Sequence, residues 1–92
     1  MASIRIKRNH DLGIENARAA VEKLAQALRS ELRADYTWSG NKLVFDRLGA
    51  SGTIDVGADY IYLDIQLGMP LSLMKSAIED SINNRLDVEL MS

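Results

Sequence analysis

The stretch from Gly52 to Leu67 reads GTIDVGADYIYLDIQL and decides the fold. On both sides of residues 57–59, apolar and polar residues alternate, which is the period-two pattern of half-buried strands. Because so short a connection joins antiparallel neighbours, the stretch predicts a β-hairpin. The core face of its second strand consists of Ile61, Leu63, Ile65 and Leu67. Tyr60, Tyr62 and Asp64 therefore point to the opposite face.

Two more short strands precede this hairpin, so that four are expected between Asp35 and Leu67. Turn signals separate the strands at residues 39–41 (SGN) and 48–50 (LGA). The large residues of each strand share a face, Tyr36 with Trp38 and Leu43 with Phe45. All the connections are short, which favours antiparallel pairing.

The N-terminal third predicts one strand followed by one helix. Residues 3–8 alternate isoleucines with basic residues, which is typical of a half-buried strand with a basic polar face. A helical pattern follows Gly13, with apolar residues spaced by three and four. These residues are Ile14, Ala17, Val21, Leu24, Leu28 and Leu32.

A second helix is expected after residues 68–70 (GMP), which end the last strand. A proline suits the first turn of a helix, where its missing N–H is not needed, and we assign Pro70 to that position. The main apolar stripe consists of Leu71, Met74, Ile78, Ile82 and Leu86. Leu73, Ala77 and Val88 widen the apolar arc beyond the ~100° that a helix on one surface requires. The helix is therefore either wrapped by a curved sheet or partly committed to a partner.

The resulting order is β-α-β-β-β-β-α over residues 1–92, which we expect to form a single α+β domain. A two-layer sandwich follows, with both helices on one face of a mostly antiparallel sheet. It resembles a reduced helix-grip arrangement, in which a curved sheet embraces a C-terminal helix. A chain of 92 residues buries a smaller share of its surface than a larger domain does, so self-association would stabilise it. We therefore also consider a homo-oligomer.

Composition argues against several classes of function. The chain contains no cysteine, which removes disulfides, thiolate metal sites and a cysteine nucleophile. The N-terminus does not read as a secretory signal, and Asp64 interrupts the most hydrophobic region, so no transmembrane segment is expected. We expect a soluble, cytoplasmic protein. The net charge of −2, with a modest basic excess in the first 33 residues, gives little support to nucleic-acid binding.

No catalytic, cofactor or metal site is expected. Residues 49–53 (GASGT) come close to a nucleophile elbow at Ser51, but the second glycine is one position early and a plain turn is favoured. His10, the only histidine, stands at the junction of strand and helix and is interpreted as a packing or hydrogen-bonding residue. Asp11 is expected to cap the first helix or to compensate its positive end. Neither carboxylates nor glycines have the spacing of an EF-hand or a phosphate loop.

Two surfaces are candidates for contact with a partner. Tyr60 and Tyr62 stand together on the outer face of their strand, where they either stack on a partner or simply suit a half-exposed strand. The second surface is the segment 69–74, which has more apolar side chains than one helix face can hide. Its candidate residues are Met69, Leu71, Leu73 and Met74. An apolar polymer, a lipid monolayer or another subunit could cover it, and core packing is the alternative.

The order and spacing of several short motifs resemble the polyhydroxyalkanoic acid system proteins. The first motifs are Ile4-Arg5-Ile6-x-Arg8-x-His10-x-Leu12, Ala17-Arg18 and Glu22-Lys23-Leu24-Ala25. The central motifs are Tyr36-x-Trp38-x-Gly40, Leu43-x-Phe45 and Gly52-x-Ile54-x-Val56. The resemblance continues through the ending, from Leu67-Gly68 to Ile78-Glu79 with Ile82, and so covers nearly the whole chain.

Members of that family are short bacterial proteins encoded near genes for making and storing polyhydroxyalkanoate. The resemblance implies a non-catalytic accessory role, with the storage granule surface or granule proteins as partners, and it brings no catalytic residues. Two other functions are kept for comparison. A carrier of a small apolar ligand between the sheet and the C-terminal helix requires an enclosed pocket of roughly 300 Å³ or more. An enzyme would need the His10 ring in a cleft beside a carboxylate.

Overall fold

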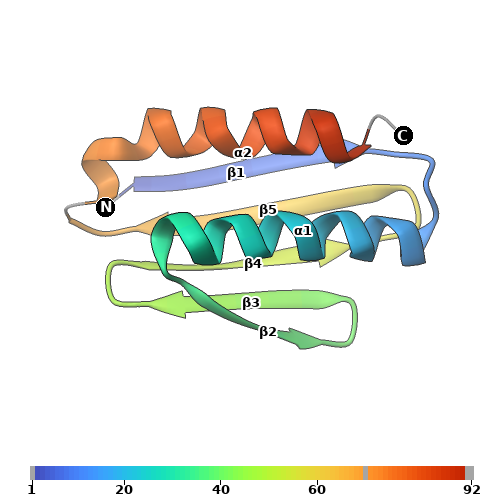
Figure 1. Ribbon diagram of the computed structural model, residues 1–92, viewed down its shortest axis with the longest axis horizontal. Coiled ribbons are helices and arrows are strands. Elements are labelled where there is room, and N and C mark those ends of the chain that lie inside the picture. Colours follow the sequence, from blue (N-terminus) through green and yellow to red (C-terminus); the bar gives the residue numbers. More distant parts are fainter. Residues whose placement is uncertain (1, 70, 91–92) are drawn as a thin grey trace.

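The computed structural model describes residues 2–69 and 71–90, with every side chain in those ranges except that of Leu32 (Figure 1). The elements are β1 (Ala2–Asn9), α1 (Ile14–Leu32), β2 (Asp35–Ser39), β3 (Lys42–Arg47), β4 (Ala50–Val56), β5 (Tyr60–Leu67), the 3-10 turn η1 (Leu71–Met74) and α2 (Lys75–Leu90). This order confirms the predicted β-α-β-β-β-β-α arrangement, although the second helix begins with a 3-10 turn. The position predicted for Pro70 lies outside the described residues.

The five strands form one sheet in the order β1-β5-β4-β3-β2, and every neighbouring pair is antiparallel. The first strand therefore pairs with the last, and α1 carries the chain from one edge of the sheet to the other. Figure 1 shows both helices on one face, α2 along β1 and α1 across β5 and β4. The predicted α+β sandwich, with both helices on the same face of the sheet, is confirmed.

Strand register explains which side chains are buried. Ile4 of β1 pairs with Ile65, which pairs with Gly52, and Gly52 pairs with Phe45, so one row crosses four strands under the helices. Gly52 is required in this row because a Cβ there would lie 2.5 Å from a backbone oxygen of β5. The fully buried large side chains are Ile4, Val21, Leu24, Leu28, Leu43, Ile54, Ile61, Leu63, Leu67, Ile82 and Leu86. They come from both helices and four strands, so a single apolar layer holds the two sides together.

The start of α1 departs from the expected capping. Its N-cap is Gly13, with a φ of 81°, and no side chain caps it by a hydrogen bond. Capping by Asp11 is therefore wrong, because Asp11 stands two residues before the N-cap position, and its compensation of the positive end of α1 stays a prediction. At the other end Arg33 is the C-cap and adopts the left-handed conformation, with a φ of 57°.

The second helix buries only part of its apolar arc. Ile78, Ile82 and Leu86 enter the core. Ala77 is exposed and Val88 is 70% exposed, so the sheet does not wrap these widening residues. Wrapping of the whole apolar arc by a curved sheet is therefore wrong, and the commitment of part of this helix to a partner stays a prediction.

Candidate functional site

One polar cluster joins α1 to the edge strand β2. The Glu22 carboxylate accepts hydrogen bonds from the Tyr36 hydroxyl at 2.5 Å and from the Trp38 indole N–H at 2.9 Å. These two bonds lower the pKa of Glu22 below its ordinary value, and the Glu22 bond raises the pKa of Tyr36. Gln26, one turn later on α1, donates to the same carboxylate at 2.8 Å.

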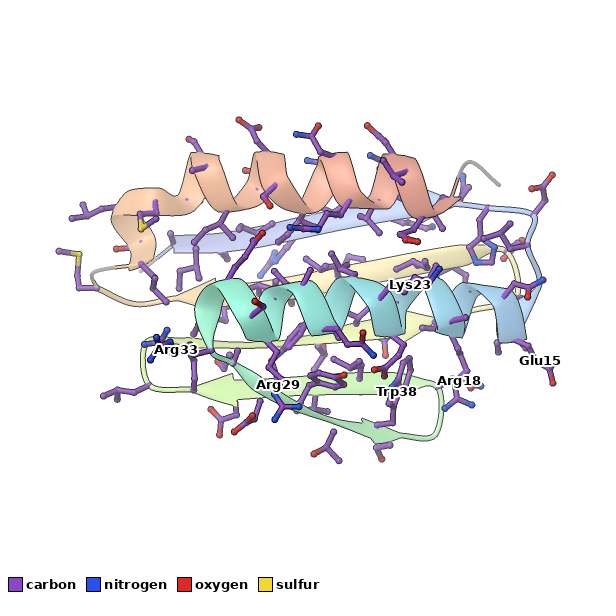
Figure 2. All side chains as sticks on the ribbon, viewed as in Figure 1. Glu15, Arg18, Lys23, Arg29, Arg33 and Trp38 are labelled. Carbon is purple, nitrogen blue, oxygen red and sulfur yellow. The ribbon has the colours of Figure 1, made fainter. Side chains whose placement is uncertain are left out.

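Arg18 also belongs to this Glu22 cluster. Its guanidinium carbon lies 4.7 Å from the centre of the Trp38 ring, a cation–π contact visible in Figure 2. An open hollow of about 330 Å³ lies beside these residues. Because partners within the chain satisfy both carboxylate oxygens, the Glu22 cluster attaches β2 to α1 and offers no unpaired acid to a substrate. The sequence pattern did not predict this cluster, since the contact depends on α1 crossing to the β2 edge.

His10 connects two loops through backbone groups. Its ring Nε2 lies 3.2 Å from the carbonyl oxygen of Gly57 and 3.3 Å from that of Tyr60, while Nδ1 accepts the Leu12 N–H at 3.2 Å. The neutral ring with its proton on Nε2 satisfies these contacts. The predicted hydrogen-bonding role is confirmed: His10 ties the β1–α1 loop to the turn between β4 and β5.

Other chemistry is sparse in the described part of the chain. Ser51 lies within β4, paired with Asp46 and Gln66, so only Gly49 of the GASGT segment is in a turn and Ser51 is in neither the expected turn nor a nucleophile elbow. Among residues 2–69 and 71–90, no group of three or more histidine, aspartate or glutamate side chains could hold a metal ion. No helix in these ranges is long and apolar enough to cross a membrane.

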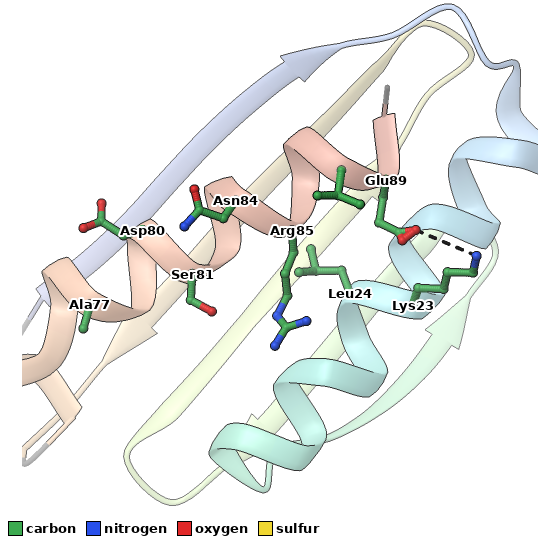
Figure 3. Close-up of a pocket in the computed structure, with 9 residues that line it drawn as sticks. Lys23, Leu24, Ala77, Asp80, Ser81, Asn84, Arg85 and Glu89 are labelled. Atoms are coloured by element: carbon green, nitrogen blue, oxygen red, sulfur yellow. Dashed lines mark ion pairs between the residues drawn. The ribbon is translucent and has the colours of Figure 1, made fainter. Parts of the chain in front are cut away.

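A groove of about 560 Å³ runs between α1 and α2 (Figure 3). Leu24, Ala77 and Val88 supply its apolar surface. Charged side chains from both helices border it, and Lys23 pairs with Glu89 across it at 3.8 Å. Its residues lie between the helices and not between the sheet and α2, where the carrier hypothesis places a ligand. A void of about 10 Å³ between α1 and the sheet is too small for one.

Tyr60 and Tyr62 lie on the helix-free face of the sheet, as predicted. Tyr60 is 37% exposed, and its ring packs across Gly57, where a Cβ would lie 2.0 Å from the nearest ring carbon. The Lys7 ammonium lies 5.8 Å from the centre of the same ring. Tyr62 is half-buried between Lys7 and Asp55, its neighbours in the register. Both rings are therefore partly used within the sheet, which leaves less free surface than two fully exposed tyrosines would give.

The segment after β5 is much more exposed. Met69 is 69% exposed, Leu73 75% and Met74 52%, while Leu71 is half-buried against the core. Leu48, in the β3–β4 turn, is 95% exposed. The Gly68 N–H donates to the Gly49 carbonyl at 2.9 Å, which holds that turn beside the start of η1. We call this set, Leu48, Met69, Leu71, Leu73 and Met74, the apolar end.

The structure thus separates the two surfaces that the sequence suggested. The apolar end follows the last residue of β5, whereas Tyr60 is the first residue of that strand. The eight residues of β5 place them at opposite ends of the sheet (Figure 1). The sequence pattern did not predict a role for Leu48 either, because a single leucine in a turn gives no periodic signal.

The similarity to known proteins extends over almost all of the folded chain. Residues 4–90 match the family described as "Putative polyhydroxyalkanoic acid system protein". The chain belongs to this family. Among solved structures it is similar to PA4090 from Pseudomonas aeruginosa, with a TM-score of 0.63 and 6% sequence identity over 100% of this chain and 88% of that one. An identity this low shows the shared fold alone, and no curated protein matches the chain.

Membership of the polyhydroxyalkanoic acid system family gives the Glu22 cluster a clear interpretation. Arg18, Glu22, Tyr36 and Trp38 all belong to the motifs on which the resemblance rests, and the structure brings them together between α1 and β2. Their contacts are internal. These motif residues therefore attach the β2 edge of the sheet to α1. A partner is expected to contact a different surface of the molecule.

Proposed function

We propose that this chain is a non-catalytic accessory protein of polyhydroxyalkanoate storage, which acts in the cytoplasm at the granule through its apolar end. Two observations support the proposal. The family match over residues 4–90 gives the polyhydroxyalkanoate setting. The exposure of Leu48, Met69 and Leu73, each more than two thirds open to solvent, gives a surface for contact.

The apolar end is the observation that carries the proposal. Scattered single apolar residues are ordinary on a protein surface, but here several come from two chain segments held beside each other. Leucine and methionine adapt to an irregular apolar partner without requiring matched hydrogen bonds. A polymer granule or an apolar patch on a granule protein would have such a surface.

The polar groups of the fold favour binding over catalysis. His10 uses both ring nitrogens on backbone partners. Glu22 uses both carboxylate oxygens on Tyr36 and Trp38. Neither group stands ready to exchange a proton with a substrate, which supports a structural or binding role.

Co-sedimentation of the purified protein with native polyhydroxyalkanoate granules tests the proposal. We expect saturable binding by the wild type, a clear loss in a Leu48→Ser/Leu73→Ser variant, and no loss in Val88→Ser. Val88 is the matched control, because at 70% exposure it is as open as Leu73 but lies near the other end of α2. A Tyr60→Ser/Tyr62→Ser variant shows whether the second surface contributes. Wild-type protein that stays in the supernatant at every granule concentration refutes direct adsorption.

A further inference from the structure

The outer edge of β2 is unpaired. β2 is the last strand of the sheet order, and Figure 1 shows it at the border of the sheet. An edge strand exposes main-chain N–H and C=O groups that can pair with another strand. The Glu22 cluster uses the side chains of Tyr36 and Trp38 on the helix side of β2, so the main-chain edge is a separate surface.

The hydrogen bonds of the sheet show which groups of β2 point outward. The Asn41 carbonyl accepts the Val56 N–H at 2.9 Å, so residue 41 directs its main chain toward β4. Because this direction alternates along an antiparallel strand, residues 42, 44 and 46 direct theirs toward β2. Their register partners are Ser39, Thr37 and Asp35. The main-chain groups of Tyr36 and Trp38 therefore point away from the sheet, and no residue within 2–69 and 71–90 bonds them.

The sequence of β2 matches itself when two copies run antiparallel. If Thr37 of each copy lies on a twofold axis, all five residues of the strand have a partner. Tyr36 then lies opposite Trp38 of the second copy, and both have outward main-chain groups that can exchange hydrogen bonds. Thr37 lies opposite its equivalent, and Asp35 lies opposite Ser39. No two directly opposite residues carry like charges.

We propose that two copies of this chain pair through their β2 edges about Thr37, so that one antiparallel sheet continues from the first copy into the second. This pairing is separate from the proposed granule role and does not depend on the apolar end. Main-chain hydrogen bonds supply the attraction, and the opposed side chains fix the register. Because a twofold contact is closed, association stops at two copies.

The helix-free face of this edge suits a second copy. Thr37 is exposed there, and Val44, its neighbour on β3, is 38% exposed. Threonine pairs and other β-branched pairs across neighbouring strands stabilise a sheet. Pairing about Thr37 joins this exposed row to the same row of the second copy, so that β-branched side chains continue across the axis.

The charged side chains on the helix-free face do not oppose the pairing. Asp35 and Asp46 lie together at one end of the β2–β3 hairpin, and Lys42 lies at the other end. Antiparallel pairing therefore directs the two carboxylates of one copy toward Lys42 of the second, with Ser39 between them. Lys42 already pairs with Asp55 of its own chain at 3.8 Å, so this attraction is weak.

The helix side and the ends of the edge also have charges of both signs. The basic residues are Arg18, Arg29, Arg33 and Arg47, and the acidic residues are Glu15 and Glu22. Arg29 pairs with Asp35 at 3.4 Å, and Arg18 lies on the Trp38 ring. A second copy therefore meets positive and negative groups together. The main-chain register, and not the net charge, selects the second copy as the partner.

The other edge of the sheet does not allow the same pairing. β1 has Arg5 and Lys7 exposed on the helix-free face. Either register that pairs nearly all of β1 with a second copy places Arg5 opposite Arg5 or opposite Lys7. Like charges directly opposite destabilise a sheet, and basic side chains commonly protect edge strands. β2 has neither lysine nor proline, and its register with β3 contains no bulge.

Sedimentation velocity over a range of concentrations tests the pairing. We expect the purified wild type to pass from monomer to dimer. Thr37→Lys should raise the dissociation constant about tenfold, because two lysines then meet on the axis, and Thr37→Glu should do the same. An equimolar mixture of these two variants should recover the dimer, since opposite charges then meet. Ser51→Lys, exposed on the same face of the inner strand β4, should leave the dissociation constant unchanged.

The absence of cysteine allows a second measurement, of register. Thr37→Cys should oxidise readily to a disulfide dimer, because opposed Cα atoms of a non-hydrogen-bonded pair lie about 4.5 Å apart, within disulfide reach. Ser39→Cys should not, because its equivalent in the second copy lies about 13 Å further along the strand. A mixture of Ser39→Cys and Asp35→Cys should cross-link, since these positions are opposite each other in the proposed register.

The failures are distinguishable. A wild type that stays monomeric up to about 1 mM overturns the proposal. So does a Thr37→Lys dimer as tight as that of the wild type, or equal cross-linking by Thr37→Cys and Ser39→Cys. A dimer that Leu48→Ser or Val88→Ser abolishes and Thr37→Lys does not has its interface elsewhere, which overturns the proposal. A monomeric wild type whose Thr37→Cys variant forms a disulfide with a granule protein identifies a foreign strand as the occupant and overturns self-pairing. Urea unfolding of each variant separates lost pairing from lost folding.

Discussion

Replacing Glu22 with glutamine should lower the free energy of unfolding by about 2 kcal/mol. The carboxylate accepts the Tyr36 hydroxyl at 2.5 Å and the Trp38 N–H at 2.9 Å. Hydrogen bonds to a charged group contribute about 1.5–3 kcal/mol each, and half-burial places these two at the lower end. Glutamine keeps one acceptor oxygen but turns its NH₂ group toward the other donor, so it retains only one weaker, neutral bond.

The same substitution should flatten the pH dependence of stability. Hydrogen bonding from Tyr36 and Trp38 holds the pKa of Glu22 below its ordinary 4.5. A carboxyl whose pKa is lower in the folded than in the unfolded state contributes stability that is fully present above the unfolded pKa. That contribution is lost as the pH falls through the folded pKa. The difference between wild type and Glu22→Gln should therefore be largest near neutrality and shrink below pH 4.5.

Urea unfolding measures both effects, because Trp38 is the only tryptophan and lies in the cluster. At about pH 7 the variant should unfold at a lower urea concentration and, on heating, roughly 10 °C earlier. Glu15→Gln is the control, since this exposed glutamate on the same helix has no partner in the described ranges and should cost less than about 0.5 kcal/mol. Equal unfolding midpoints for the two variants, or a Glu22→Gln deficit as large at about pH 3 as at neutrality, would refute the reasoning.

Three further comparisons test the packing by urea unfolding, and each cost given below is a decrease in the free energy of unfolding. Gly52→Ala should cost about 3 kcal/mol because its Cβ would press on the β5 backbone, whereas Gly40→Ala, with open space around it and a φ of 62°, should cost about 1 kcal/mol. His10→Ala should cost about 1–2 kcal/mol through its lost hydrogen bonds, and granule co-sedimentation of the folded variant should not change. Ile82→Ala should cost about 3 kcal/mol and Val88→Ala almost nothing, since one side chain is fully buried and the other 70% exposed; equal costs would contradict the placement of α2.

The fold was predictable because its signals are local and periodic. Alternation between residues 52 and 67 predicted the β4–β5 hairpin, and the three-and-four spacing after Gly13 predicted α1. Short connections predicted the antiparallel pairing of the last four strands. The Asp11 cap was wrong because the helix begins after a glycine with a positive φ, and a local pattern does not reveal which residue takes the N-cap position.

The arrangement of the surfaces was not predictable in the same way. Tyr60 and Met69 are close in sequence, but the extended strand between them carries them to opposite ends of the sheet. Leu48 joins Met69 only because β4 and β5 run side by side, which brings the turn before one strand next to the loop after the other. The Glu22 cluster likewise requires β2 to be the far edge strand. Such contacts depend on strand order, which the sequence pattern does not specify.

The exposure of Leu48 allows its substitution to test binding separately from stability. At 95% exposure it contributes almost no buried area, so Leu48→Ser should leave the free energy of unfolding within about 0.5 kcal/mol of the wild type. Any loss of granule binding in that variant then arises at the surface and not from unfolding. The Glu22 cluster differs from Leu48 because its contacts are internal. Its loss should therefore lower the free energy of unfolding before it affects binding. If granule binding by Leu48→Ser and Glu22→Gln decreased in parallel with their free energies of unfolding, the apolar end would not be the contact. Binding that fails only in Leu48→Ser would place the contact there.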